Sequence, residues 1–277
     1  MTVKEPMQKI VKNHKDVQKS QNRLEPFDSF VYVYPSPLIE GVFVKRYKRF
    51  FADIEIDGKV EVAVVPNTGS LKTCLEPGAP CRVSRSNDPK RKFSLTLEQM
   101  RAAHSWVGVN THLPNRMVAC LLENESFAEW MSFRSFYPEV KISAQSRIDF
   151  VLTKQPSEKK RITINDLEVN PHNFRLIEVK NVTMGEKGCA YFPDSVTERG
   201  QKHLKELMQW KALGAECEMI YLIQRDDCSN FEPASLIDPV YTELFHQAKK
   251  VGVKITPLFA KIDSVGISLK TNGESAS

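Results

Sequence analysis

The chain has 277 residues, of which 41% are hydrophobic, and carries a formal net charge of +5. This length and composition suit a soluble protein with one large domain or two ordinary ones around a substantial core. No run approaches the roughly 18 apolar residues of a membrane span, and residues 1–30 lack the apolar centre of a secretory signal. We therefore expect a cytoplasmic protein with no membrane partner.

The cysteines and the charge distribution narrow the class further. The six cysteines include no C-x-x-C pair, which argues against a zinc site and a disulfide framework. Residues 1–105 hold 18 Lys and Arg against 12 Asp and Glu, a balance of +6, so the remainder carries −1. A basic N-terminal part suits a polyanionic partner, although solubility alone also explains a modest positive charge.

The N-terminal third has the pattern of a small β-domain. Residues 1–35 are predicted to be a flexible extension, because most of them are polar and lysine-rich without sustained apolar periodicity. Short β-branched and alternating runs follow, separated by turn signals such as Asp57-Gly58 and Pro77-Gly78. They predict a five-stranded, oligonucleotide-binding (OB) type β-barrel in residues 36–105. The expected strands are 38–46, 48–56, 60–65, 80–85 and 92–97.

Residues 106–262 are α/β in character. Pro114 predicts the start of a helix that ends near Asn124, and Ser195 with Glu198 predicts a capping box for a helix that reaches Leu213. A strand at 218–224, a helix at 239–251 and a strand at 253–259 complete an alternation that implies a partly parallel sheet. Residues 153–173 form a polar insertion, expected to hold a hairpin or to be mobile, and residues 263–277 form a C-terminal tail.

Two apolar segments carry acidic residues at a suggestive spacing. Asp149 lies in the first segment, and Glu178-Val179-Lys180 follows after 28 intervening residues. Side chains alternate faces in a strand, so Glu178 and Lys180 project to the same side. Burying such groups without a partner is costly, which suggests a shared cation or a nearby phosphate. The pattern resembles the PD-(D/E)xK nuclease motif with Ile148 in place of the proline, although so short a motif also matches by chance.

Five blocks make the resemblance more specific. They are residues 44–50 (VKRYKRF), 66–70 (PNTGS), 146–150 (SRIDF), 178–183 (EVKNVT) and 192–200 (FPDSVTERG). In this order they resemble the sugar fermentation stimulation protein A family over residues 38–259. The resemblance implies an α+β two-domain protein, in which an OB-like barrel precedes a C-terminal α/β PD-(D/E)xK nuclease-like domain, and it implies DNA binding. The extension at 1–35 and the insertion at 153–173 depart from the family pattern.

The resemblance also implies a metal site. Asp149 and Glu178 would hold Mg²⁺ or Mn²⁺ with the carbonyl of Val179, since hard oxygen ligands suit a cation that retains water. That water would be the nucleophile, and Lys180 would orient it or stabilise charge on the phosphate. The predicted catalytic set is Asp149, Glu178, Lys180, Glu139 and Gln224. The alternative for the central residues is a buried ion pair without catalytic role, and for Gln224 an ordinary polar residue at a strand end.

Basic and polar residues outside this set are candidates for nucleic-acid contacts. Basic residues of the first block interleave with aromatic residues, as in single-strand binding, although part of such a pattern is core and solvated surface. Arg199 and His203 share one helix face and are expected near phosphate, or form an ordinary helix surface. The predicted contacts are Lys45, Arg46, Lys48, Arg49, Asn67, Thr68, Arg147, Arg199 and His203.

The sequence therefore favours a DNA-binding, Mg²⁺- or Mn²⁺-dependent nuclease. DNA, single- or double-stranded and bound without strong sequence preference, is the expected partner, and a homo-oligomer is an open alternative. The main rival is a non-catalytic DNA-binding regulator of sugar metabolism genes. A nucleotide- or carbohydrate-linked metabolic enzyme is disfavoured, because the chain has no glycine-rich phosphate loop.

Overall fold

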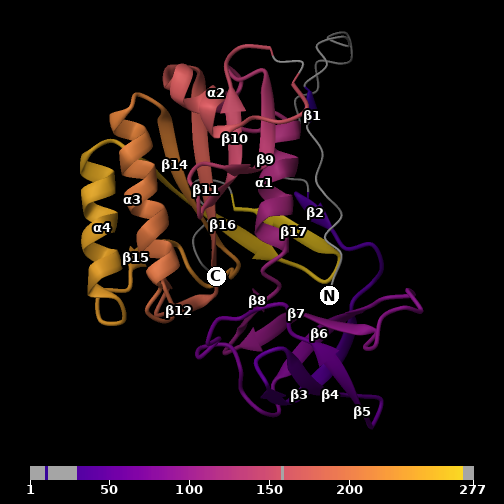
Figure 1. Cartoon of the computed structure of the whole chain (residues 1–277). Helices are drawn as coiled ribbons and strands as arrows, with labels where there is room; N and C mark the ends of the chain where they lie inside the picture. Colours follow the sequence, from indigo (N-terminus) through magenta and orange to yellow (C-terminus); the bar gives the residue numbers. More distant parts are fainter. Residues whose placement is uncertain (1–9, 12–29, 157–158, 271–277) are drawn as a thin grey trace.

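The computed structural model describes residues 10–11, 30–156 and 159–270. Figure 1 shows a small β-barrel at one end of a larger α/β domain. Within these ranges no helix is long and apolar enough to cross a membrane. All six cysteines are unpaired and four of them are buried, as the sequence predicts.

The predicted five-stranded barrel is present. Five strands in the order β5-β4-β3-β6-β7 form it, a parallel pairing of β5 with β7 closes it, and β8 extends the sheet beyond β7. Alternate residues of each strand fill one interior, with Phe43, Ile54 and Leu97 buried in it. The strands are β3 (Ile39–Tyr47), β4 (Phe51–Ile56), β5 (Lys59–Val64), β6 (Pro80–Arg85), β7 (Leu95–Ala102) and the short β8 (Ser105–Gly108).

The second domain is built on an eight-stranded mixed sheet. Its order is β1-β9-β10-β11-β14-β16-β17-β2, with β11, β14 and β16 parallel and the remaining pairs antiparallel. The predicted partly parallel sheet is confirmed. The strands are β1 (Ile10–Val11), β2 (Tyr32–Val33), β9 (Ser135–Lys141), β10 (Arg147–Thr153), β11 (Phe174–Val182), β14 (Glu216–Ile223), β16 (Lys254–Ile262) and β17 (Gly266–Leu269).

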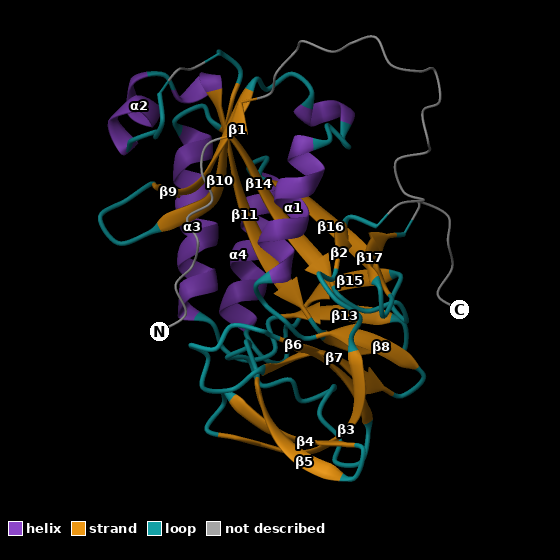
Figure 2. Ribbon diagram, turned by 90° about the vertical axis from the view of Figure 1, so that its right-hand side faces the viewer, coloured by secondary structure: helices purple, strands orange, loops and turns teal. Residues whose placement is uncertain are grey.

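Helices cover both faces of this sheet (Figures 1 and 2). Ile177 of β11 packs in the cluster of α1 (Leu113–Glu123), whereas its neighbour Leu176 packs in the cluster of α3 (Glu198–Ala212) and α4 (Pro239–Lys250). Both faces are thus buried, which explains why the central strands read as continuous apolar runs. The remaining elements are α2 (Ile164–Val169), β12 (Met184–Glu186), β13 (Cys189–Phe192), β15 (Asn230–Pro233) and the 3₁₀ turns Ala128–Trp130 and Pro171–Asn173.

The chain ends differ from the expected extension and tail. Tyr32 pairs with Ile267 and Val33 with Gly266, so β2 and β17 complete one edge of the large sheet. The expected extension at 1–35 therefore contributes two strands to the large sheet, β1 beside β9 and β2 beside β17, and the expected tail at 263–277 contributes one. Residues 1–9, 12–29 and 271–277, the rest of those predictions, lie outside the described residues. Strand β8 also carries the barrel sheet past the expected boundary at residue 105.

Two local predictions also need correction. Helix α3 begins at Glu198 with Thr197 as N-cap, whose hydroxyl accepts the Gly200 N–H at 3.1 Å, so the box expected at Ser195 does not form. The insertion at 153–173 contains helix α2 rather than a hairpin, because Thr163 and Asp166 cap its first turn reciprocally.

Candidate active site

Asp149 lies where two strands of the large sheet stop pairing. The antiparallel ladder of β10 and β11 runs from Thr153 opposite Phe174 to Phe150 opposite Ile177 and ends there. Beyond that point the backbone N–H of Val179 donates instead to Oδ2 of Asp149 at 2.7 Å. The carboxylate of Asp149 is thus held at the end of the ladder, because it accepts the hydrogen bond that a backbone carbonyl of the partner strand would otherwise accept.

A residue from α1 fixes the other oxygen of this carboxylate. Nδ2 of Asn115 donates to Oδ1 of Asp149 at 2.7 Å. Asn115 is placed there because Pro114 opens the helix directly above the sheet. Nothing in the local sequence marks Asn115 as a site residue, so its role emerges only from the packing of α1 on β11.

Glu178 forms a compact polar cluster with two basic groups. Nζ of Lys180 donates to Oε1 of Glu178 at 2.6 Å and lies 3.0 Å from Nδ1 of His203, which itself contacts the same carboxylate oxygen. The expectation that Glu178 and Lys180 share one face of the strand is therefore met. His203 is buried above them in α3, although the sequence suggested a phosphate contact. The other oxygen of Glu178, Oε2, is buried without a hydrogen-bond partner in the structure.

The two carboxylates have opposite electrostatic surroundings. Burial, and then the adjacent charge of Glu178, raise the pKa of Asp149 to about 7 despite Lys180 and two hydrogen bonds. Burial acts in the same direction on Glu178, but Lys180 and His203 outweigh it and hold the pKa of that carboxyl well below its usual range. Like charges at close range compete for ionisation, so without a cation the pair holds a proton near neutral pH.

The donor set fits a hard divalent cation. Asp149 and the unpartnered Oε2 of Glu178 supply carboxylate oxygen, and the Val179 carbonyl lies on the same side of the strand as its N–H, toward Asp149. Across residues 10–11, 30–156 and 159–270 there is no group of three or more His, Cys, Asp or Glu side chains placed for a metal. Two carboxylates and a carbonyl suit Mg²⁺ or Mn²⁺, which keep several waters, better than Zn²⁺.

Glu139 lies at the rim of this site. Ile148 pairs with Val140 and Phe150 with Pro138, so the register sets Glu139 opposite Asp149 on the neighbouring strand. Its side chain is exposed, and its backbone has a φ of 54°, a value uncommon for a residue with a side chain. In the described structure it makes no hydrogen bond to Asp149 or Glu178, so its role as a ligand stays a prediction.

Among the described residues, Gln224 is linked to the site through a hydrogen bond to Asn181, which lines a cavity between the two domains. Its side chain is fully buried, and Nε2 donates to Oδ1 of Asn181 at 2.6 Å. Its carbonyl accepts the N–H of Gly108 at 2.8 Å, which joins the end of β14 to β8 of the barrel. This geometry gives Gln224 an interdomain role, and no contact of it with Asp149 or Glu178 is present among the described residues.

Two predicted nucleic-acid contacts are engaged inside the protein. The guanidinium of Arg46 donates to the carbonyls of Asn67 at 2.6 Å and Gly69 at 2.9 Å. The Asn67 side chain is buried, donates to the Val109 carbonyl at 3.1 Å and accepts the Gly69 N–H at 2.7 Å. Both residues therefore shape residues 66–70, hereafter the PNTGS loop, whose chemistry exceeds that of a simple turn as the sequence suggested.

Four further predicted contacts are on the surface, away from that cavity. Lys45 pairs loosely with Asp53 at 3.5 Å, and Lys48 and Arg49 occupy the exposed β3–β4 turn. Arg147 is exposed at the start of β10. Surface ion pairs of this kind contribute little to stability, so these side chains remain free to meet a phosphate backbone.

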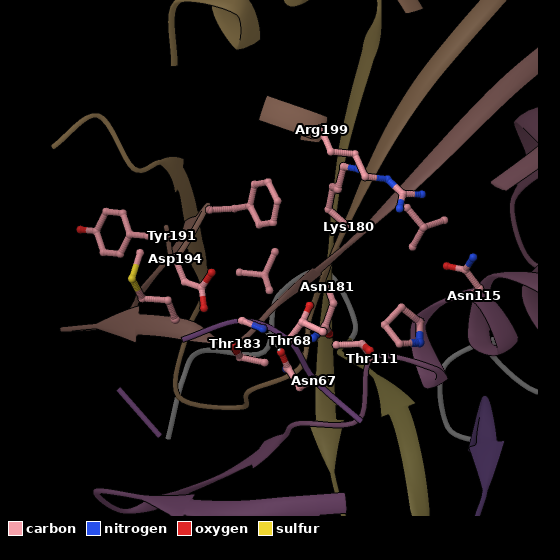
Figure 3. A pocket seen from close by; sticks show the side chains of 16 residues that line it. Asn67, Thr68, Thr111, Asn115, Lys180, Asn181, Thr183, Tyr191, Asp194 and Arg199 are labelled. Atoms are coloured by element: carbon pink, nitrogen blue, oxygen red, sulfur yellow. Dashed lines mark hydrogen bonds between the residues drawn. The ribbon is translucent and has the colours of Figure 1, made fainter. Parts of the chain in front are cut away.

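A cavity of about 350 Å³ opens beside the site, between the two domains. The PNTGS loop lines one side, and the C-terminal half of β11 lines the other, with Thr68 and Lys180 both on its wall (Figure 3). Asp194 holds the loop to the α/β domain, because its Oδ2 accepts the N–H and hydroxyl of Ser70 at 2.7 and 2.9 Å. No local sequence signal marks Asp194 for this role, since the contact joins residues 124 positions apart.

Fold and site together define a class of protein. Its members have two domains, an OB barrel followed by an α/β domain in which two adjacent strands each carry an acidic residue, here Asp149 and Glu178. Comparison with known proteins narrows the class. Residues 44–109 match the SfsA N-terminal OB domain and residues 112–266 match the sugar fermentation stimulation protein RE domain. The chain belongs to the sugar fermentation stimulation protein family.

Curated relatives and a solved structure agree with this assignment. The homolog from Bdellovibrio bacteriovorus is 44% identical over 85% of this chain and 96% of its own length. Homologs from Geotalea daltonii and Synechocystis are 39% and 41% identical over 86% of this chain, and 96% and 95% of their own lengths. The structure of Pyrococcus furiosus SfsA in complex with Ca²⁺ matches with a TM-score of 0.74 and 23% identity, over 90% of this chain and 98% of that one. This last likeness concerns the fold.

Proposed function

We propose that this chain is a DNA-binding, divalent-metal-dependent nuclease that hydrolyses phosphodiester bonds at Asp149, Glu178 and Lys180. The observation that carries the proposal is the buried Oε2 of Glu178, which has no hydrogen-bond partner among the described residues. The raised pKa of the neighbouring Asp149 supports it. An unpartnered carboxylate oxygen inside a protein is costly, and a cation held by Asp149 and Glu178 would offset that cost.

Each neighbouring residue has a definite task in this proposal. A bound cation supplies positive charge at the phosphate and lowers the pKa of water. Lys180, 2.6 Å from Glu178, lines the cavity and is placed to donate to an oxygen of the phosphate as charge develops. Asn115 and the Val179 N–H orient Asp149, and His203 packs against Glu178 and Lys180 so that both keep their positions.

Two observations support the choice of cation. The oxygen-only donor set suits a hard ion, and the related SfsA from Pyrococcus furiosus was solved in complex with Ca²⁺. We propose Mg²⁺ or Mn²⁺ as the working cation, because both prefer the same ligands and leave positions open for water and phosphate.

DNA is the proposed partner because of the barrel. OB folds bind oligonucleotides, and Lys48, Arg49 and the half-exposed Phe50 gather at one exposed turn of this barrel. Cations that follow the backbone make binding fall steeply with salt. The barrel would supply affinity, and the α/β domain would supply the chemistry.

The test is cleavage of single- and double-stranded DNA by the purified full chain with Mg²⁺ or Mn²⁺. Lys180→Ala is expected to lower cleavage by about 10²-fold or more while DNA affinity changes little, because it removes charge stabilisation at the phosphate. Lys205→Ala is the matched control, since Lys205 is an exposed lysine of α3 outside the site. Equal activity of the wild-type protein and Lys180→Ala, or no cleavage with any of these substrates and metals, would contradict the proposal.

A non-catalytic DNA-binding regulator is the second candidate. It is favoured by one feature of the site, namely that Lys180 and His203 both engage Oε1 of Glu178 and no third acidic ligand joins Asp149 within the described ranges. Such a protein binds DNA with the same salt dependence but leaves it intact in both metals. The cleavage experiment therefore separates the two candidates directly.

A further inference from the structure

We propose that the interdomain cavity holds one unpaired nucleotide of the nucleic-acid strand, so that the protein acts on single-stranded segments or frayed ends rather than on intact duplex. The preference for unpaired substrate rests on the proposed nuclease function, whereas the nucleotide site itself does not.

The cavity is continuous with the candidate active site. Val179 and Lys180 belong to its lining, as does Asn115, the partner of Asp149. Thr68 and Thr111 face them from the barrel side (Figure 3). A nucleotide in the cavity would thus have its phosphate beside Lys180, and only a strand that enters between the two domains brings a phosphate to that position.

The size of the cavity limits its occupant. About 350 Å³ is near the lower end of the roughly 300–1,000 Å³ found for small-ligand sites. A duplex, whose major groove alone is about 12 Å wide, does not enter such a space, whereas a nucleotide removed from the stack does. The dimensions therefore favour one extruded or unpaired nucleotide.

The lining offers polar groups of the type that read a nucleotide. Oδ1 of Asn181 accepts from Gln224, which orients the side chain and leaves its own NH₂ group without a partner among the described residues. The Thr68 hydroxyl and the Arg199 guanidinium likewise make no hydrogen bond within the described structure. An amide and a hydroxyl suit a base edge or sugar, and a guanidinium suits a phosphate.

The cavity is preformed, because hydrogen bonds from both domains fix its wall in the absence of a ligand. Asp194 holds the PNTGS loop from the α/β domain and Arg46 holds it from the barrel. At Gly69 a Cβ would lie 2.8 Å from Oδ2 of Asp194, so a side chain there would displace the carboxylate that holds Ser70. A wall fixed by both domains avoids the entropic cost of ordering on binding.

Binding of single nucleotides tests the site without any need for catalysis. Deoxynucleoside 5′-monophosphate, deoxyribose 5-phosphate and inorganic phosphate are titrated calorimetrically into the full chain in EDTA. We expect the nucleotide to bind at least about tenfold more tightly than inorganic phosphate. Thr68→Phe, which fills the cavity from an exposed loop position, should weaken nucleotide binding at least about tenfold. Val60→Phe, an exposed barrel position outside the lining, should change it less than about twofold.

Either of two binding results overturns the nucleotide site: equal affinity for nucleotide and inorganic phosphate, or no effect of Thr68→Phe. Cleavage rates then test the preference for unpaired strands. With Mg²⁺ or Mn²⁺, single strands should be cut at least about tenfold faster than blunt duplex, and Thr68→Phe should remove most of that difference. Nucleotide binding that is sensitive to Thr68→Phe in a protein that cuts nothing leaves the site standing and refutes the nuclease. Cutting of single strands and blunt duplex at equal rates refutes the preference alone.

Discussion

The backbone N–H of Val179 donates to Oδ2 of Asp149 at 2.7 Å, across the point where β10 and β11 stop pairing. This contact determines where the candidate site lies. It holds the Asp149 carboxylate beside Glu178, and the carbonyl of Val179, the residue whose N–H donates, points to the same side of the strand. The position of the site is therefore a property of the sheet, not of a flexible loop.

Asn115→Leu should lower cleavage by about tenfold with little change in DNA affinity. The substitution keeps a side chain branched at Cγ but removes the amide that donates to Oδ1 of Asp149, and loss of such an orienting partner typically costs about 10- to 100-fold. Asn124→Leu, an exposed asparagine at the other end of α1, is the control. Equal kcat for both variants would show that Asn115 does not orient the carboxylate.

The contribution of Asp149 to the stability of the metal-free protein should fall as the pH rises from about 4 to about 7. Burial and the charge of Glu178 raise the pKa of Asp149 to about 7, above its ordinary value of about 3.9, so within this window the native state holds a proton that the unfolded chain has lost. Asp149→Asn stays neutral and should remove this decline. Urea unfolding in EDTA across the window measures it, and parallel curves for the two proteins would refute the assigned shift.

Asp194→Ala should destabilise the protein by about 2–4 kcal/mol and loosen the PNTGS loop. One carboxylate oxygen accepts the backbone N–H groups of Ser70 and Leu71 and the Ser70 hydroxyl, and its removal leaves buried donors unpaired. Urea unfolding and limited proteolysis of the loop measure the two effects. Ser195→Ala, the exposed neighbour, should be close to wild type; equal stability of both variants would argue against an interdomain clamp.

Arg46→Ala should lower protein stability, whereas Lys48→Ala should weaken the salt dependence of DNA binding. Arg46 donates to two carbonyls of the PNTGS loop, so its loss should lower protein stability by about 1–3 kcal/mol. Lys48 is exposed at the β3–β4 turn, so its loss should leave stability unchanged and reduce the salt slope of DNA binding by about 1. Unfolding curves and affinities at several salt concentrations distinguish the two. A stable Arg46→Ala protein with a reduced salt slope would instead place Arg46 in the DNA contact.

Sequence reasoning located most of the fold because its signals are local. Alternating residues and turn signals gave the barrel strands to within a few residues, and Pro114 with Asn124 bounded helix α1. The strands β2 and β17 were missed because each is very short and is stabilised by the other. Tyr32 pairs with Ile267 across most of the length of the chain, and no local periodicity reveals such a pairing.

The residues of the candidate site likewise fall into two groups: those that local sequence patterns indicate and those that only tertiary contacts bring to the site. The strand period alone sets Glu178 and Lys180 on one face, and a helix spacing of four set His203 with Arg199. Asn115 and Asp194 were missed as site residues because they act through tertiary contacts that join distant segments. For the same reason Arg46 and Asn67 read as nucleic-acid contacts, although their hydrogen bonds shape the PNTGS loop.

The most direct test of the central claim is the anomalous scattering of crystals grown with Mn²⁺. We predict a single strong peak between the carboxylates of Asp149 and Glu178, within about 2.5 Å of the Val179 carbonyl, and its loss in Glu178→Gln. No peak at this position with Mn²⁺ in excess, or the same peak in Glu178→Gln, would contradict a metal-dependent site in this protein.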